Sequence, residues 1–227
     1  MPDVTPTPRV VSADDQSLVR IGFRMILAAN GVDVVGEAAD GAEAAALVRE
    51  HQPGVVLIDI RMPTMDGLEA TRRVLEVAPA CRVLILTTFD LDCYVYAALA
   101  AGASGFLLKD VTPEHLVAAV RLVNTGDALP APSITRRLVE KYAATAEKEI
   151  PRTAVHRGAL TPRELEVLTL MGRGRSNAEL AAEVTLSEAP VKTHVAPILA
   201  KVGLRDRAQA VVLAYATGLV VPGDSHE

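Results

Sequence analysis

Short apolar runs alternate with helix-like segments along the first half of the chain. Several of the runs are rich in β-branched residues and lack the apolar–polar alternation of a half-exposed strand. Such runs are typical of parallel strands that are buried on both faces. We predict strands at Arg9–Ala13, Val32–Glu37, Val55–Ile60, Val83–Thr87 and Gly105–Leu108.

The segments between these runs carry apolar residues at helical spacing. The predicted helices are Gln16–Ala29, Ala42–His51, Leu68–Val77, Leu91–Ala101 and Pro113–Asn124. Thr112 is expected to cap the last of them, with Pro113 at its first position. Strands that alternate with helices in this way predict an α/β, doubly wound sheet of five parallel strands. In such sheets, binding sites lie at the carboxyl ends of the strands.

The pattern changes after Gly126. A breaker cluster, Leu129–Pro132, precedes a predicted helix at Ile134–Ala146, and residues 147–158 read as a polar linker. Four helices are then predicted, at Pro162–Met171, Asn177–Val184, Glu188–Val202 and Arg205–Thr217. We therefore expect an α/β domain at residues 8–127, a linker with a helix at 128–158, and a small all-α helix-turn-helix domain at 159–221.

Length, net charge and composition favour a two-domain globular protein over a membrane protein or a non-specific nucleic-acid binder. A chain of 227 residues suits two small domains, and its net charge of −5 discourages non-specific nucleic-acid binding by the whole molecule. An apolar run long enough to cross a membrane is missing, as is a signal-peptide pattern at the start, so we expect a cytoplasmic protein without membrane contact. Cys81, Cys93 and the scattered histidines show no metal-ligand spacing.

Four predicted strand ends carry the residues of one site. Asp14 and Asp15 follow the first strand, Asp59 lies near the end of the third, Thr87 ends the fourth, and Lys109 follows the fifth. Crowded carboxylates repel one another, and a divalent cation such as Mg²⁺ relieves that repulsion. A metal beside a carboxylate, with an ammonium group nearby, is the arrangement that phosphoryl transfer needs.

The first half resembles the receiver domain of bacterial response regulators, a flavodoxin-like fold. The resemblance covers roughly residues 8–127 and rests on four segments, Asp14–Asp15, Leu57–Leu68, Leu84–Thr88 and Ala101–Lys109.

By that resemblance, Asp59 accepts a phosphoryl group from a histidine kinase. Asp14, Asp15, Asp59 and the Ile60 backbone carbonyl would bind Mg²⁺. The resemblance further implies that Thr87 and Lys109 contact the phosphoryl group, that Phe106 changes rotamer with Thr87, and that Pro63 and Gly67 shape the loop after Asp59.

Helix-start signals divide the second half. Thr161, Pro162 and Glu164 form a capping-box pattern, and Ser176 and Ser187 are expected to cap the next two helices. The short link between those two helices predicts a helix-turn-helix, whose second helix enters the major groove of DNA.

Residues Leu160–Val221 resemble the DNA-binding domain of the NarL/LuxR (FixJ) family. The matching segments are Leu160–Leu168, Gly174–Ala182, Ser187–Ala189, Val191–Val195 and Ile198–Leu204. The resemblance implies that Glu188–Val202 is the recognition helix and that Arg205–Thr217 mediates dimerisation. Its DNA contacts would be Lys192, Thr193 and Ala196 facing the groove, with His194 and Lys201 near phosphates.

Two prolines depart from the family pattern. Pro190 lies in the first turn of the recognition helix, where a missing N–H costs little. Pro197 lies in the middle of the helix, where it removes a hydrogen bond and costs about 3 kcal/mol or kinks the helix. The resulting hypothesis is weakened or altered DNA binding.

Three functions remain open at this stage. The first is a transcription factor that dimerises and binds double-stranded promoter DNA when Asp59 is phosphorylated, and that is not an enzyme. The second is a regulator that acts through protein contacts, with DNA binding weakened by Pro190 and Pro197. The third is a phosphohydrolase with Asp59 as nucleophile, which the attached helix-turn-helix argues against.

Overall fold

The computed structural model describes residues 7–87, 97–126, 160–184 and 188–220. The chain divides into two compact units, Met1–Ala128 and Leu129–Glu227. The predicted helix Ile134–Ala146, the polar segment 147–158 and the first six residues of the predicted helix Leu91–Ala101 lie outside the described residues. Within those residues, no helix combines the length and the apolarity needed to span a membrane.

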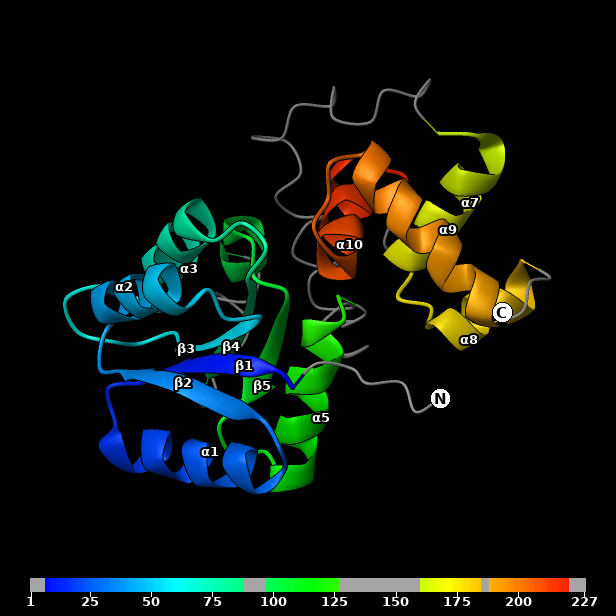
Figure 1. Ribbon diagram of the computed structural model, residues 1–227. Helices are drawn as coiled ribbons and strands as arrows, with labels where there is room; N and C mark the ends of the chain where they lie inside the picture. Colours follow the sequence, from blue (N-terminus) through cyan, green and yellow to red (C-terminus); the bar gives the residue numbers. More distant parts are fainter. Residues whose placement is uncertain (1–6, 88–96, 127–159, 185–187, 221–227) are drawn as a thin grey trace. The chain divides into compact units, whose positions relative to one another are not determined.

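The first unit is built on a parallel five-stranded sheet in the order β2-β1-β3-β4-β5 (Figure 1). Its strands are β1 (Arg9–Ala13), β2 (Asp33–Ala38), β3 (Val55–Asp59), β4 (Arg82–Thr87) and β5 (Gly105–Leu108). The predicted doubly wound sheet is confirmed, because the chain turns from one side of β1 to the other between β2 and β3.

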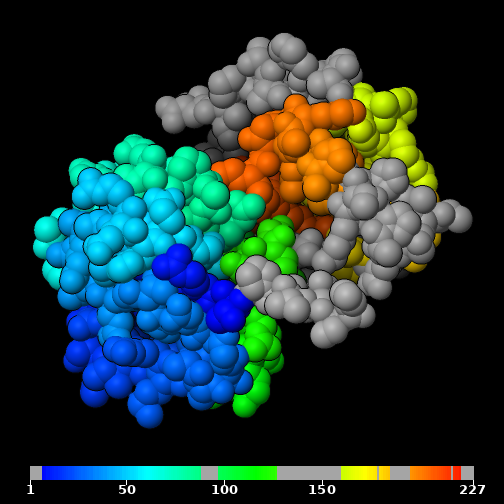
Figure 2. Space-filling model, viewed as in Figure 1, coloured from blue at the N-terminus to red at the C-terminus, as the bar shows by residue number. Residues whose placement is uncertain are grey.

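Helices cover both faces of this sheet (Figure 1). The first face carries α1 (Ser17–Ala29) and α5 (Pro113–Asn124), and the second carries α2 (Gly41–His51) and α3 (Gly67–Val77). The space-filling view shows α2 and α3, coloured light blue to teal, as one continuous surface (Figure 2). Residues 97–101 are also helical.

Alternating strand residues fill two apolar cores. On the α1–α5 face, Leu57, Leu84 and Leu86 pack in one cluster with Phe23 and Leu116. Because successive strand residues point to opposite faces, the residues between them serve the α2–α3 face. Every residue of β3 is buried, which explains why this strand reads as one uninterrupted apolar run that ends in Asp59.

Side chains that cap the first turn determine where the helices begin. The Asp40 and Asp66 side chains accept hydrogen bonds from backbone N–H groups in the first turns of α2 and α3. Thr112 caps α5 as predicted, with its hydroxyl accepting from the His115 N–H. Asp40 and Asp66 start their helices one residue earlier than the apolar pattern indicated, because the pattern does not register a glycine at the first helical position.

The second unit is all-helical where it is described, as predicted. Its helices are α7 (Pro162–Gly172), α8 (Asn177–Glu183), α9 (Glu188–Lys201) and α10 (Arg207–Ala216). Both capping boxes are complete, Thr161 with Glu164 and Ser176 with Glu179. An apolar cluster that includes Leu168, Met171, Leu180 and Ile198 joins α7, α8 and α9.

One helix start in this unit differs from the prediction by two residues. The predicted helix Arg205–Thr217 begins only at Arg207, because the buried Asp206 side chain accepts a hydrogen bond from the Gln209 N–H and acts as N-cap. The recognition helix was predicted to include Pro197, with a kink or a lost hydrogen bond there. Helix α9 continues through Pro197 to Lys201, so the proline does not end it.

Candidate functional site

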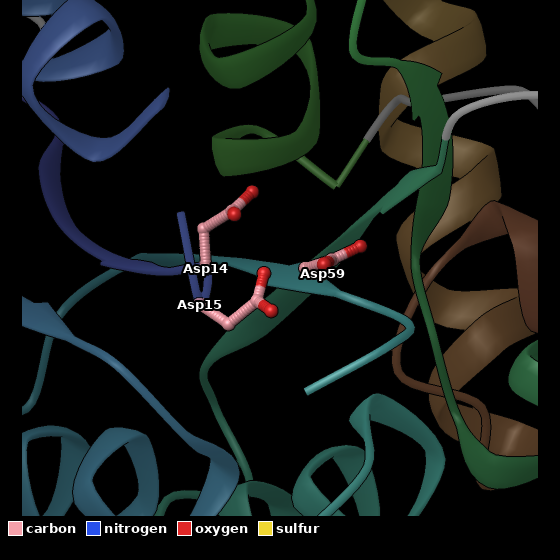
Figure 3. Close-up of side chains that lie close together, drawn as sticks. All are labelled: Asp14, Asp15 and Asp59. Atoms are coloured by element: carbon pink, nitrogen blue, oxygen red, sulfur yellow. The ribbon is translucent and has the colours of Figure 1, made fainter. Parts of the chain in front are cut away.

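Three carboxylates meet at the carboxyl ends of β1 and β3. Asp14 and Asp15 directly follow β1, and Asp59 is the last residue of β3 (Figure 3). One carboxylate oxygen from each residue lies within 4.8 Å of the others. Asp14 is fully buried, Asp59 is 5% exposed and Asp15 is exposed. The three aspartates therefore lie together, as their positions at the predicted strand ends indicated. The exposed Asp15 is the member of the cluster that contacts solvent most.

Lys109 bridges two of these carboxylates. Its Nζ lies 2.7 Å from Asp14 Oδ2 and 2.9 Å from Asp59 Oδ2, and its side chain is only 9% exposed. One ammonium group thus balances two buried carboxylates from two neighbouring strands. Without an additional cation, the cluster keeps an excess of negative charge.

Burial and pairing oppose each other in this cluster. Burial raises the pKa of the Asp59 carboxyl above its ordinary 3.8, although Lys109 and the Arg61 backbone N–H work against the rise. Burial also acts to lower the pKa of Lys109, but the Asp14 and Asp59 carboxylates outweigh it and the pKa is raised. Lys109 therefore stays charged, while ionised Asp59 is held at a cost.

That cost predicts a pH-dependent effect of Asp59→Asn in the absence of divalent metal. The pKa of Asp59 is raised on folding, so its contribution favours folding below its ordinary pKa of 3.8 and is lost as the pH rises through the raised value. We expect the variant to be more stable than the wild type at pH 7, on the order of 1 kcal/mol. The difference should vanish near pH 4.

Urea unfolding at the two pH values measures this difference in the free energy of unfolding. Asp33→Asn is the matched control, because Asp33 is exposed and a surface substitution changes stability by less than about 0.5 kcal/mol. An Asp59→Asn variant that is less stable than the wild type at pH 7 would contradict the prediction that ionised Asp59 destabilises the folded state.

Thr87 and Lys109 are held next to each other by the sheet. Thr87 pairs with Leu108 in the register of β4 and β5, and the Thr87 carbonyl accepts a hydrogen bond from the Lys109 N–H at 2.9 Å. Phe106 lies opposite Ile85 in the same register and is half-buried. Thr87 and Lys109 therefore occupy the strand ends beside Asp59 that the sequence predicted for them, and Phe106 lies within β5.

The loop that follows Asp59 is held close to it by backbone contacts. A Cβ atom added at Gly67 would lie 2.3 Å from the Asp59 carbonyl oxygen, so only glycine fits there. The Ile60 carbonyl, predicted as a metal ligand, accepts a hydrogen bond from the Gly67 N–H at 2.9 Å. One of its two lone pairs is therefore already used. Asp15, Ile60, Arg61 and Asp66 line a surface hollow at this point.

Three further groups, two backbone N–H groups and one guanidinium, donate hydrogen bonds to the aspartates of the cluster. The Gln16 N–H donates to Asp14 Oδ1 at 2.9 Å, and the Arg20 guanidinium donates to the Asp14 carbonyl at 2.6 Å. The Arg61 N–H donates to the Asp59 carboxylate. The position of Gln16, two residues after an aspartate, is a known signal for such a turn, whereas nothing in the sequence pattern marks Arg20 or Arg61.

The predicted DNA contacts all fall on α9. The helix includes Lys192, Thr193 and His194, but the structure does not describe the side chains of these three residues. Ala196 is exposed, in agreement with a position on the outer face. Lys201 is 44% exposed, and its Nζ lies 2.7 and 2.9 Å from the two carboxylate oxygens of Glu164 at the start of α7. The residue proposed to contact a phosphate thus has a partner within its own domain.

Known families match both units. The family described as response regulator receiver domain matches residues 10–121, and the luxR family of bacterial regulatory proteins matches residues 158–214. An uncharacterized transcriptional regulatory protein of Bacillus subtilis, YxjL, is 41% identical over 214 residues, which cover 93% of this chain and 97% of the relative. The chain is a response regulator of the LuxR type.

Further relatives match this response regulator over nearly its full length. The transcriptional regulatory protein DegU of Brevibacillus brevis is 38% identical over 225 residues, covering 93% of the chain and 94% of the relative. The crystal structure of the response regulator ChrA of a heme-sensing two-component system is 36% identical, with a TM-score of 0.50, and covers 94% of the chain and 99% of that structure. The receiver domain of a putative response regulator NarL from Mycobacterium tuberculosis is 44% identical and covers 53% of the chain and 98% of that structure, with a TM-score of 0.51.

Membership of this family settles the broad function. This response regulator is a DNA-binding transcriptional regulator of a two-component system, built from a receiver domain and a LuxR-type helix-turn-helix domain. A histidine kinase and DNA are the partners that these two domains imply. The family consists of transcriptional regulators.

Proposed function

We propose that phosphorylation of Asp59 by a histidine kinase switches this response regulator to a dimer that binds promoter DNA. The observation that carries the proposal is the bridge between strands, in which Lys109 Nζ lies 2.9 Å from Asp59 and 2.7 Å from Asp14. Asp59 is buried enough to be enclosed by these groups and yet lies at a strand end beside the exposed Asp15.

The donor set of the cluster fits Mg²⁺. Three carboxylates with oxygens within 4.8 Å of one another are hard oxygen ligands, which Mg²⁺ prefers. Asp14, Asp15 and Asp59 would hold the ion, together with the predicted Ile60 carbonyl through its remaining lone pair. When bound, the ion supplies positive charge beside the transferred phosphoryl oxygens.

Phosphoryl transfer would use the Asp59 carboxylate as nucleophile. An Asp59 oxygen forms the new P–O bond while the P–N bond to the kinase histidine breaks, and the histidine nitrogen leaves with the electron pair of that bond. Lys109 and the Arg61 N–H favour the ionised carboxylate that this attack requires. Lys109 can then follow the new negative charge and give up its bridge to Asp14.

The switch is proposed to pass from Asp59 to β4 and β5. The Thr87 hydroxyl would move to a phosphoryl oxygen, and Phe106 would occupy the space that Thr87 leaves. Because the Lys109 N–H is bonded to the Thr87 carbonyl, both phosphoryl contacts act on one pair of strands. Two DNA half-sites need two recognition helices, which is the reason for proposing a dimer as the active form.

Phosphorylation with acetyl phosphate and Mg²⁺ tests this function. The wild-type chain should dimerise and bind DNA fragments of its promoter more tightly, by about tenfold or more, as a coupling free energy of 1–3 kcal/mol implies. Size-exclusion chromatography with light scattering and a titration at fixed salt measure the two effects. Asp59→Ala should show neither effect, whereas the exposed control Asp33→Ala should behave as wild type.

The same experiment separates the other readings. A wild type that takes up phosphate without dimerising or gaining DNA affinity would leave a regulator that acts through protein contacts. Steady turnover of a small phosphate ester that depends on Asp59 would indicate a phosphohydrolase. Helix α9 continues through Pro197 to Lys201, and the measured DNA affinity decides whether the proline weakens binding.

A further inference from the structure

The exposed face of the recognition helix is apolar and nearly flat over its described part. In the stretch 195–201, Val195 and Ile198 are buried, whereas Ala196, Pro197 and Ala200 are exposed. Ala200 lies three positions after Pro197 and four after Ala196, so it adjoins both on the helix surface, and the three form one surface, here called the methyl face. None of the three side chains carries a hydrogen-bond donor or acceptor.

The charge beside the methyl face is a lysine that is paired within its own domain. Lys201, at the end of the helix, is the charged residue on this described stretch; its side chain is 44% exposed and its Nζ lies 2.7 Å from Glu164 Oε1, so a DNA phosphate would have to replace that partner. No carboxylate occurs between residues 195 and 201. A surface that pairs small apolar side chains with a flanking cation can approach polyanionic DNA closely.

Small side chains change what the helix is able to read. With nothing longer than a Cβ or a proline ring on the methyl face, this part of the helix can approach the base edges more closely than a lysine or arginine at these positions would permit. Any base edge covered by the methyl face loses water and gains no hydrogen bond, which is unfavourable for the polar edges of guanine, cytosine and adenine. The C5-methyl group of thymine is the one apolar group that the four bases present in the major groove.

We propose that the methyl face reads thymine methyl groups, with Ala196 and Ala200 as the specificity-determining residues. The inference rests on the proposed function, because it assumes that α9 enters the groove of promoter DNA. It narrows that function to a sequence class, namely half-sites with thymine opposite the methyl face. Apolar contact with alanine is an established mode of recognising thymine.

Replacement of thymine by deoxyuridine tests the proposal, since it deletes only the methyl group. The full chain, treated with acetyl phosphate and Mg²⁺, first selects its binding sites from random double-stranded DNA. Each thymine of the selected site is then replaced singly by deoxyuridine and affinity is measured at fixed salt. We expect one or two positions in each half-site to lose about fourfold in affinity, the effect of one buried methyl group.

Two serine variants assign the effect to the helix. Ala196→Ser adds a hydroxyl at an exposed position, where serine is only slightly less favourable in a helix than alanine, so the domain should fold. We expect this variant to bind the selected thymine site more weakly than the wild type. At one position, replacing thymine by deoxyuridine should then lower the affinity of the variant less than it lowers that of the wild type. Ala46→Ser, on the exposed surface of α2, is the matched control and should keep the full loss.

The outcomes separate this inference from the function on which it rests. Selected sites that bind tightly but tolerate deoxyuridine at every position would overturn thymine reading and leave promoter binding intact. A deoxyuridine loss that is the same in Ala196→Ser as in wild type would also overturn it. Failure to select any DNA would instead contradict promoter binding itself, and thymine reading with it.

Discussion

A Lys109→Met variant is expected to bind Mg²⁺ about tenfold or more tightly than the wild-type chain before phosphorylation. The ammonium group of Lys109 contacts the carboxylate oxygens of Asp14 and Asp59 at 2.7 and 2.9 Å. It therefore competes with a cation for two of the three proposed ligands. Removing it deletes the repulsion between two positive centres in a buried site and leaves the carboxylates unbalanced. Tenfold corresponds to only about 1.4 kcal/mol, which is small for such a change.

The Mg²⁺-induced rise in the midpoint of unfolding reports this affinity, because a ligand of the folded state stabilises it by mass action. The matched control is Lys201→Met, which removes an ammonium group paired with Glu164 in the other unit. We expect that variant to bind Mg²⁺ as the wild type does. Equal or weaker affinity in Lys109→Met would show that Lys109 and the metal do not share ligands.

The same variant should lose the response to phosphorylation. Mg²⁺ and Asp59 remain, so acetyl phosphate should still modify the chain, as mass spectrometry measures. The phosphoryl group would lack its ammonium partner, however, and the pull on β5 through the Thr87–Lys109 hydrogen bond would be absent. The gain in DNA affinity, expected to be about tenfold in wild type, should fall close to one.

Replacement of Arg207 by methionine is expected to destabilise the helical unit by about 3 kcal/mol or more. The Arg207 side chain is 1% exposed, and its guanidinium donates to Asn177 Oδ1 at 2.6 Å and to the Arg175 carbonyl. It thereby joins α10 to the turn between α7 and α8. Removing one member of a buried polar network takes a hydrogen bond from each of its partners, which is among the costliest single changes.

Calorimetry of the full chain measures this loss as a lower transition temperature of the helical unit. Arg173→Met is the control, because Arg173 is exposed and its removal should change stability by less than about 0.5 kcal/mol. DNA affinity should fall in Arg207→Met because α8 begins at Asn177. A variant with wild-type stability would mean that the network is replaceable by apolar packing.

The sequence predicted the receiver fold closely because its signals are local. Buried parallel strands read as apolar runs, and the boundaries of β1 and β5 are those predicted from Arg9–Ala13 and Gly105–Leu108. The ends of parallel strands meet at one edge of the sheet, so Asp14, Asp59 and Lys109 were brought together correctly. The proposed roles of these residues remain predictions for the experiments above.

Contacts between distant residues were not predictable from pattern. The ion pair of Lys201 with Glu164 joins residues that are 37 positions apart, and the bond of Arg207 to Asn177 spans 30 positions. Charged side chains are mostly solvated, so sequence reasoning assigns them to the surface by default. The start of α10 was also predicted two residues too early from apolar spacing. That spacing does not register the turn in which Asp206 caps the helix.

The ion pair at Lys201 bears on how DNA binding should depend on salt. Glu164 already acts as a fixed counterion for this lysine, at 2.7 Å. A phosphate that takes its place would still release condensed cations from the DNA, but the freed Glu164 carboxylate would repel the backbone and attract cations, so the net release would be smaller. The slope of log affinity against log salt should therefore be shallower than a count of lysines and arginines near the helix suggests. Part of the binding free energy would offset the loss of this ion pair, which joins the end of α9 to the capping box at the start of α7.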